Sequence, residues 1–281
     1  MKICRFDDQR IGVLRHGQVF DVTERLAPLL AVHAGAGDPL IAALPRLPAM
    51  LVDLSGCTPK PQDQVRWLAP VAQPGKIVAA PVNYHAHIAE MQANNVSPGF
   101  NITDIGKAGL FLKATSSLVG ASQGIAQRFL DRRTDFEVEL VVVIGRRADR
   151  VAAADALQYV AGYSLGLDIT VRGTEERSFR KSIDSYTVLG PWLTTADELP
   201  GPGQLQITLH QNGELRQRGH TSDLVYGVAR LIEFASSFYT LEPGDLLYTG
   251  TPEGVGAIRP GDRLRAECEA LGAMDVTVRA A

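Results

Sequence analysis

The stretch DFEVELVVVIG, residues 135–145, sets a carboxylate at every second position and then continues as an unbroken apolar run. Successive side chains of a β-strand point to opposite faces, so Asp135, Glu137 and Glu139 are expected on one face and the apolar residues between them on the other. Carboxylates beside the apolar run 141–144 approach a core, where an uncompensated charge is costly. The stretch therefore predicts a strand that enters a core, with positively charged groups placed against its acids.

The composition of the chain is that of an ordinary globular protein. Its 281 residues, 45% of them hydrophobic, are enough to bury a large core in one or two domains. The formal net charge is −3, from 28 basic and 31 acidic residues, and no basic run stands out. Neither nucleic acid nor an anionic membrane surface is therefore an expected partner.

The cysteines and the N-terminus favour a cytoplasmic protein. Cys4, Cys57 and Cys268 are odd in number and far apart, and they form no CxxC spacing, which argues against a disulfide framework and a structural zinc site. The opening MKICRFDDQR lacks the apolar core of a signal peptide, and no apolar run reaches the ~18 residues that a membrane span needs. We therefore expect a reducing, cytoplasmic location.

The pattern of elements divides the chain into a small N-terminal α+β domain, residues 1–70, and a larger, mostly β domain, residues 71–281. In the first, short strands around tight turns precede short packed helices within 26–54, where Pro, Gly and charged residues interrupt an apolar segment. In the second, strands predominate, and Asn212-Gly213 predicts a type I′ hairpin turn. The fold class expected from these patterns is α+β, mostly β.

Two helices and one loop are expected within the larger domain. Apolar residues of 224–235 recur at helical spacing after a Thr221 or Ser222 cap, and this helix is expected to stop before Leu241. A second short helix is expected over 153–160. The polar segment ANNVSPGFNITDIG, residues 93–106, contains Gly and Pro and is typical of a mobile loop.

The alternating acids are candidate ligands for a metal ion. Glu137 and Glu139 offer a pair of carboxylates, and Asp168, near the end of the strand-like GYSLGLDIT, offers a third. Oxygen ligands without a nearby His or Cys suit Mg²⁺, Mn²⁺ or Ca²⁺ better than a thiolate-bound zinc. The alternative is a solvated strand face that pairs with Lys or Arg across the sheet.

A candidate general base lies in NYHAHIAEM, residues 83–91. His87 and Glu90 are three residues apart, which places both on one face of a helix within hydrogen-bonding reach. A carboxylate bonded to one imidazole nitrogen makes the other nitrogen a better proton acceptor, so the pair can activate water. His85 points elsewhere. The alternative is an ordinary surface His–Glu pair on an exposed helix.

The glycine-rich YTGTPEGVG, residues 248–256, offers backbone N–H groups, including that of Gly250, and the Thr251 hydroxyl to an anionic ligand. It is neither a Walker loop, since GK[ST] is missing, nor a dinucleotide fingerprint, since the glycine spacing differs. A plain tight turn is the alternative. Lys113, Arg172 and Lys181 each follow apolar sequence, so each can reach into a pocket, although most such residues are surface charges.

Taken together, segments over residues 70 to 278 resemble the fumarylacetoacetate hydrolase family, in the family's order. The matching pieces are NYHAHIAEM, FLKATSSLVG, DFEVELVVVIGRRA, YVAGYSLGLDITVR, RKSID, LGPWLTTADELP, NGELRQ, TLEPGDLLYTGTPEGVG and the closing PGD. The resemblance implies a mixed β-roll catalytic domain, a homodimer, and Mg²⁺, Mn²⁺ or Ca²⁺ held by Glu137, Glu139 and Asp168. A bound cation would then explain why the acids lie together.

The same resemblance implies roles for individual residues. His87 and Glu90 match the dyad that activates water, and Lys181 matches a catalytic lysine. Residues implied at the substrate are Tyr84, Lys113, Arg172, Gly250 and Thr251. Four positions depart from the family's pattern and make the substrate-facing rim unusual: Leu167, Gly173, Arg180, and Glu175, which stands where several relatives have a substrate-contacting Gln.

The resemblance and the chemistry together predict a divalent-metal-dependent hydrolase that cleaves a carbon–carbon bond in a β-diketo acid of the acylpyruvate or fumarylpyruvate type. Such an acid can chelate the cation through its carboxylate and 2-oxo oxygen, which stabilises the departing enolate of pyruvate. Oxaloacetate-type decarboxylation and isomerisation of a hydroxydiene dioate stay open, because both pass through a similar enolate. A metal-stabilised protein that binds an acidic metabolite without turnover is the third possibility.

Overall fold

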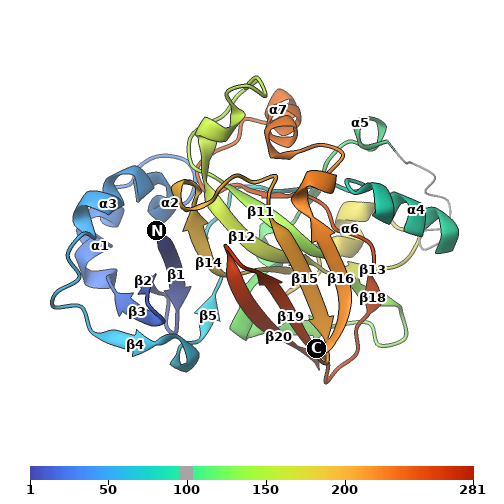
Figure 1. The fold of residues 1–281 in the computed structure, drawn as a ribbon, viewed down its shortest axis with the longest axis horizontal. Helices are drawn as coiled ribbons and strands as arrows, with labels where there is room; N and C mark the ends of the chain where they lie inside the picture. Colours follow the sequence, from blue (N-terminus) through green and yellow to red (C-terminus); the bar gives the residue numbers. More distant parts are fainter. Residues whose placement is uncertain (95–103) are drawn as a thin grey trace.

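We describe the fold from a computed structural model, which covers residues 1–94 and 104–281. Most regular structure consists of strands, as expected, and they form three sheets (Figure 1). Most of the predicted mobile loop, residues 93–106, lies outside the described residues. No helix in the described part of the chain is long and apolar enough to span a membrane.

The largest sheet runs through the whole molecule in the order β4-β3-β2-β1-β14-β12-β11-β17-β6-β7, with β5 and β8 attached beside it. Its twelve strands are β1 Lys2–Phe6, β2 Arg10–Arg15, β3 Gln18–Asp21, β4 Pro59–Pro61, β5 Trp67–Leu68, β6 Ile77–Ala79, β7 Phe111–Lys113, β8 Leu118–Gly120, β11 Val138–Ile144, β12 Val160–Asp168, β14 Thr187–Thr195 and β17 Leu246–Tyr248. Most pairs are antiparallel, but β6 runs parallel to β17 and β8 parallel to β14. The sheet is therefore mixed.

Strand β11 lies between β12 and β17 and is buried along its whole length. Its two faces pack into different apolar clusters: Val138, Leu140, Val142 and Ile144 into one, and Val141 and Val143 into the other. A strand that is covered on both faces reads as a continuous apolar run, which explains the sequence VVVI. Phe136 joins the first cluster, so the predicted apolar face is confirmed.

The expectation of one continuous strand over 135–145 was wrong, because the chain leaves one sheet and enters another at Glu137. The residues before it form β10 in a separate sheet of order β13-β10-β18. This sheet comprises β10 Thr134–Phe136, β13 Thr170–Val171 and β18 Gly256–Ala257. Glu137 is therefore placed at a junction between two sheets, where side-chain groups replace regular strand partners.

A third sheet covers the C-terminal part of the molecule in the order β16-β15-β19-β20-β9 (Figure 1). Its strands are β9 Ile125–Gln127, β15 Gln206–Gln211, β16 Glu214–His220, β19 Arg263–Cys268 and β20 Gly272–Ala280. The two-residue turn between β15 and β16 has φ of 55° at Asn212 and 86° at Gly213. Two positive φ values are what a type I′ turn requires, so the predicted hairpin is confirmed.

The helices are short and lie around the sheets. They are α1 Thr23–Ala31, α2 Pro39–Ala43, α3 Leu47–Met50, α4 His85–Asn94, α5 Ile105–Ala108, α6 Arg177–Lys181 and α7 Val228–Phe238. The short helices expected within 26–54 are present. Helix α7 begins later than predicted, after Gly227, because Thr221–Asp223 forms a separate 3₁₀ turn. The helix expected over 153–160 is only a 3₁₀ turn, Ala156–Tyr159.

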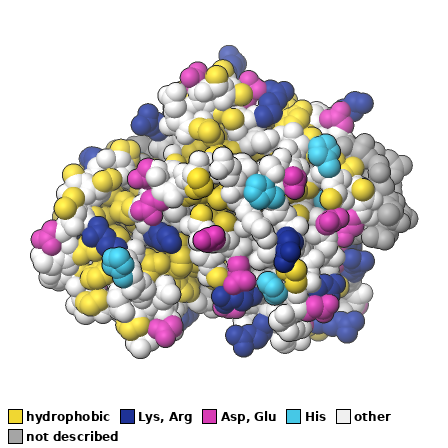
Figure 2. Space-filling view, viewed as in Figure 1, with side chains coloured by type: hydrophobic (Ala, Val, Ile, Leu, Met, Phe, Trp, Pro, Cys, Tyr) yellow, Lys and Arg dark blue, Asp and Glu magenta, His cyan; other side chains and the backbone are white. Residues whose placement is uncertain are grey.

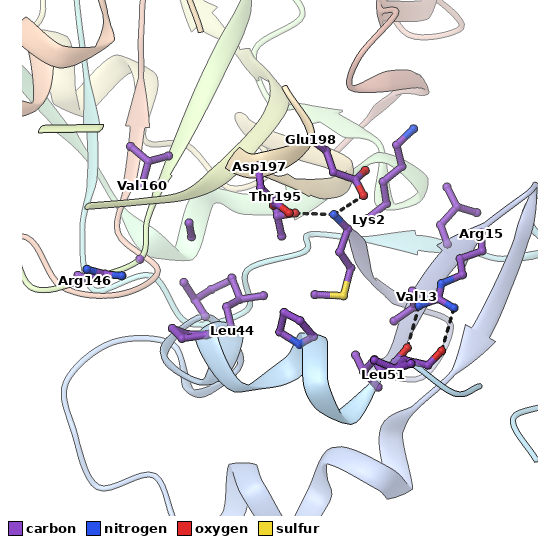
Figure 3. A pocket seen from close by; sticks show the side chains of 18 of the residues that line it. Lys2, Val13, Arg15, Leu44, Leu51, Arg146, Val160, Thr195, Asp197 and Glu198 are labelled. Atoms are coloured by element: carbon purple, nitrogen blue, oxygen red, sulfur yellow. Dashed lines mark hydrogen bonds and ion pairs between the residues drawn. The ribbon is translucent and has the colours of Figure 1, made fainter. Parts of the chain in front are cut away.

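The N-terminal strands extend the large sheet, because β1 pairs with β14 through Lys2 and Ile3. A cavity of about 650 Å³ lies at this junction, and Figure 3 shows its wall, where the N-terminal amine contacts Thr195 and Glu198. Figure 2 shows apolar side chains gathered over the N-terminal part of one face. The domain boundary near residue 70 stays a prediction.

Candidate metal and catalytic site

Three buried carboxylates converge where β11 begins and β12 ends. Oxygen atoms of Glu137, Glu139 and Asp168 all lie within 4.8 Å of one another. The pairing of the two strands explains the convergence: Glu139 lies opposite Gly166 on β12, and the Asp168 N–H donates to the Glu137 carbonyl at 2.9 Å. The local alternation of β11 and the end of β12 thus bring the three predicted metal ligands together.

Three cations surround this carboxylate cluster. The Lys181 ammonium bridges Glu137 and Asp168, at 2.6 Å from an oxygen of each. Lys113 donates to the other Asp168 oxygen, and its Nζ also donates to the Tyr186 carbonyl. The positive groups predicted beside the acids are therefore present.

Arg172 supplies the third cation and joins the cluster to Asp135, the first acid of residues 135–145. Its Nη2 donates to Glu137 Oε1 at 2.8 Å, and its Nε donates to Asp135 Oδ2 at 2.7 Å. The other Asp135 oxygen accepts from Arg133 at 2.8 Å. Both oxygens of Asp135 are therefore bound by arginines, and Asp135 is not a candidate metal ligand.

The two glutamates of the cluster differ in their electrostatic surroundings. Burial alone would raise the pKa of Glu137, but the charges of Lys181 and Arg172 outweigh it and hold this pKa well below its usual range. Burial also raises the pKa of Glu139, and there the negative charge of Asp168 adds to the effect. The ionised form of Glu139 is therefore disfavoured by its own neighbours.

The donor set fits a hard divalent cation. Among the described residues, Glu139 forms no ion pair, and its carboxylate accepts a hydrogen bond from the Gly250 N–H at 2.6 Å. A buried carboxylate that faces two others needs a positive charge, and three carboxylates are ligands typical of Mg²⁺, Mn²⁺ or Ca²⁺. Glu137, Glu139 and Asp168 could hold such an ion.

The predicted His–Glu pair is formed on helix α4. His87 Nδ1 lies 3.0 Å from Glu90 Oε2, and His87 is buried, with 3% of its surface exposed. The N–H groups of Gly250 and Gly254, four residues apart in one turn, bond Glu139 and Glu90 respectively, so the pair lies near the carboxylate cluster. Burial would raise the pKa of Glu90, but hydrogen bonds from His87 and Gly254 lower it, which keeps this carboxylate ionised. His85 on the same helix is exposed.

The glycine-rich turn after β17 holds carboxylates of the chain itself. The Gly250 N–H binds Glu139, and the Gly254 N–H donates to Glu90 Oε1 at 3.0 Å. The Thr251 hydroxyl donates to the Val138 carbonyl at 2.9 Å. One turn therefore fixes an acid of the cluster and the acid of the His–Glu pair together, which the sequence pattern alone did not indicate.

Gln217 on β16 is a site residue that sequence reasoning missed. It is fully buried, its Oε1 accepts from the Val138 N–H at 3.0 Å, and its Nε2 donates to Thr251 Oγ1 and the Pro252 carbonyl, each at 2.8 Å. The sequence signal that could have found it is its place in the strand: Gln217 lies between Arg216 and Arg218, so it points to the face opposite to these two charged side chains. Gln217 therefore connects the β15–β16 hairpin to the start of β11 and to the glycine-rich turn after β17.

The other residues singled out in the sequence form no hydrogen bond or ion pair with the carboxylate cluster among the contacts of the described residues. Tyr84 is buried at the start of α4, and burial raises the pKa of its hydroxyl above the usual range. Glu175, which the resemblance implies at the substrate-facing rim, forms an ion pair with Arg132 at 2.8 Å. Arg180 is buried, and its Nη1 donates to the Val171 carbonyl.

Comparisons with known proteins agree with this geometry. The family model described as fumarylacetoacetate (FAA) hydrolase, C-terminal, matches residues 76–279. Over 286 residues the chain is 53% identical to a maleylpyruvate hydrolase of Aquipseudomonas alcaligenes, covering 99% of each. It is also 36% identical over 224 residues to the mitochondrial oxaloacetate tautomerase Fahd2a of Rattus norvegicus, covering 75% of this chain and 69% of that protein.

A solved structure extends the likeness to the whole fold. The crystal structure of a maleylpyruvate hydrolase from Sphingobium sp. SYK-6, in complex with manganese(II) and pyruvate, matches with a TM-score of 0.84 at 36% identity. The match covers 100% of this chain and 99% of that one.

Proposed function

The chain belongs to the fumarylacetoacetate hydrolase family, and from this membership and its buried carboxylates we propose a divalent-metal-dependent hydrolase that cleaves a carbon–carbon bond of an acylpyruvate. Maleylpyruvate is the substrate we favour, because maleylpyruvate hydrolases match the chain over nearly its whole length in sequence and in structure. The observation that carries the proposal is the convergence of Glu137, Glu139 and Asp168 near the His87–Glu90 pair.

We assign Glu137, Glu139 and Asp168 as ligands of Mg²⁺ or Mn²⁺, with Ca²⁺ as a further candidate. A bound ion would orient the carboxylate and 2-oxo group of the substrate and stabilise the negative charge that develops there. Lys181 and Arg172 hold Glu137 in its ionised form, ready to act as a ligand. The manganese in the related crystal structure supports the choice of metal.

In the proposed reaction His87 takes a proton from water, while Glu90 holds Nδ1 and stabilises the imidazolium that forms. The water oxygen bonds to carbon C4 of the substrate, the C3–C4 bond breaks, and its electron pair passes to the pyruvate fragment as an enolate. Lys181 stabilises the developing charge, and the proton held by His87 is returned to C3. The products are pyruvate and a carboxylic acid, which is maleate when the substrate is maleylpyruvate.

The substrate contacts of Tyr84, Lys113, Arg172, Gly250 and Thr251 stay predictions. The bonds of the last three favour a positioning role, since Arg172 and Gly250 hold cluster carboxylates and Thr251 holds the backbone of β11.

We also propose that the enzyme works in the cytoplasm as a homodimer. All three cysteines are free thiols, which is compatible with a reducing compartment. The dimer rests on the family likeness, and light scattering after size-exclusion chromatography would measure it.

The test is an assay of the purified chain with maleylpyruvate, fumarylpyruvate, acetylpyruvate and oxaloacetate, after EDTA treatment and again with Mg²⁺ or Mn²⁺. We expect stoichiometric pyruvate and maleate from maleylpyruvate with metal, and at least about 10²-fold less turnover without it. Decarboxylation or tautomerisation of oxaloacetate, with no hydrolysis of any acylpyruvate, would overturn the proposal in favour of the family's other reactions.

A further inference from the structure

Helix α6 presents two cations on one face toward the site. Arg177 and Lys181 are four residues apart, so their side chains lie one above the other along the helix. Both stand over the same aromatic ring: Arg177 Cζ lies 5.5 Å and Lys181 Nζ 5.2 Å from the centroid of the Phe111 ring. Phe111 begins β7, the strand that carries Lys113. Arg177 thus continues the row of cations outward from the carboxylate cluster.

Three other cations lie directly against the carboxylate cluster. Lys181, Lys113 and Arg172 each contact a carboxylate of the cluster. Arg177 stands one helical turn further out, on the same face of α6 as Lys181, and is only partly buried. Arg177 therefore lies within one helical turn of the lysine that bridges two carboxylates of the cluster.

The electrostatic surroundings of Arg177 agree with this position. Burial lowers the pKa of its guanidinium, and the nearby charge of Arg180 lowers it further. Glu137 and Asp168 are among the carboxylates that act in the opposite direction, so Arg177 lies within electrostatic reach of the cluster. A partly desolvated arginine gains more from a carboxylate ligand than one in bulk water does.

We propose that Arg177 binds the distal carboxylate of a dicarboxylic acylpyruvate and so selects substrates with an acid group at both ends. The inference rests on the proposed function, which places the other end at the cluster. Four residues of helix rise about 6 Å, and five carbon–carbon bonds between the 2-oxo carbon and the distal carboxylate of maleylpyruvate span a similar length, roughly 5–6 Å. A guanidinium can also bind a carboxylate with two parallel hydrogen bonds, which gives geometric selectivity.

Arg180, the other arginine of α6, faces a different space. Its Nη1 donates to the Val171 carbonyl at 3.2 Å. It lines a cavity of about 320 Å³ together with Phe129 and Phe179, and in the described part of the chain neither Arg177 nor Lys181 contributes to that wall. Arg180 is therefore directed to this other cavity, whereas Arg177 shares the Phe111 ring with Lys181.

The test compares two substrates in the Mn²⁺-loaded enzyme: maleylpyruvate, which has the distal carboxylate, and acetylpyruvate, which has a methyl group there. We expect Arg177→Gln to lower the ratio of kcat/KM for maleylpyruvate over acetylpyruvate by about 30-fold, mostly through KM. Arg177→Lys should recover part of the ratio, because it keeps the charge but loses the second hydrogen bond. Arg128→Gln is the control, since Arg128 is an exposed arginine paired with Asp184, and it should leave the ratio unchanged.

Equal losses on both substrates would mean that Arg177 only supports the fold of α6, and wild-type activity on both would mean that the distal carboxylate binds elsewhere. Either result overturns the inference while leaving the hydrolase proposal intact. If the wild-type enzyme hydrolyses neither acylpyruvate, the proposed function itself fails and the inference fails with it. Using a ratio of substrates separates recognition from folding, because a poorly folded variant loses both activities together.

Discussion

Glu137 and Glu139 are two residues apart, but their surroundings shift their pKa values in opposite directions. Glu137 accepts hydrogen bonds from Lys181 and Arg172, which keep it ionised. Glu139 accepts one from a backbone N–H and lies near the negative charge of Asp168. Glu139 forms no ion pair among the described residues, so its charge is repelled by Asp168 and Glu137. A bound divalent cation would offset this repulsion.

Replacing Glu139 with Gln should therefore separate metal binding from stability. The amide keeps an oxygen for the Gly250 N–H but removes the disfavoured charge, so the metal-free Glu139→Gln protein should unfold with a free energy about 1 kcal/mol higher than wild type. Urea unfolding in EDTA measures this. Mn²⁺ affinity, measured by calorimetry, should fall at least about 10-fold. The matched control is Glu214→Gln on the exposed face of β16; wild-type Mn²⁺ affinity in Glu139→Gln would refute the ligand assignment.

The His87–Glu90 pair makes a second prediction at this scale. His87→Ala and Glu90→Ala should each reduce acylpyruvate hydrolysis about 10²-fold, because water then has no general base, while Mn²⁺ affinity stays close to wild type. The double variant should lose little more than either single one, since the two residues act as one unit. His85→Ala, on the exposed side of the same helix, is the control. Near wild-type rates in both single variants would leave the pair a structural contact.

At the scale of elements, the break between β10 and β11 is what creates the site. In a continuous strand the Val138 N–H would donate to the backbone of a neighbouring strand. At the junction it donates to the Gln217 side chain instead. The same amide reaches Thr251 and Pro252, so the β15–β16 hairpin, the start of β11 and the glycine-rich turn are fixed against each other. A buried, fully bonded polar group of this kind specifies one arrangement of its neighbours.

Gln217→Leu should reveal how much this connection contributes. Leucine fits the volume but leaves the Val138 N–H and the Pro252 carbonyl without their partner, so we expect the free energy of unfolding to fall by about 2–4 kcal/mol. Urea unfolding of the metal-free protein measures it, with Gln206→Leu at an exposed position of the same sheet as the control. A loss as small as that of the control would mean that water replaces the amide at the junction.

Sequence reasoning succeeded where the physics is local. The alternation at Asp135, Glu137 and Glu139 predicted buried acids with cations beside them, and the Asn212-Gly213 pair predicted its own turn. It failed where a partner is distant in sequence. Gln217 is 79 residues from the Val138 N–H that it satisfies, so neither the strand break nor the role of this amide could be predicted from residues 135–145. The late start of α7 has the same origin, because the Thr221 hydroxyl accepts from the Leu205 N–H instead of capping the helix.

At the scale of the whole molecule, the N-terminal segment is built into the large sheet. β1 pairs with β14, a strand more than 180 positions later, and Val141 and Val143 of β11 share an apolar cluster with residues of α2. Asp38 adds a polar link, because its buried carboxylate accepts N–H bonds from Leu40 and Ile41 at the start of α2 and from Ala72 and Gln73 beyond the proposed boundary. The face of β11 that ends in Glu139 is thus covered by the N-terminal segment.

We therefore expect the chain to unfold as one cooperative unit, although residues 1–70 are proposed as a domain of their own. Scanning calorimetry of the full chain should give one transition whose calorimetric and van't Hoff enthalpies agree. Asp38→Ala removes an acceptor of four N–H groups, so it should lower the midpoint of that transition without splitting it, whereas Asp8→Ala at an exposed position should not. If Asp38→Ala instead resolves a separate transition at lower temperature, the N-terminal segment folds independently, and the shared sheet does not couple it to the site.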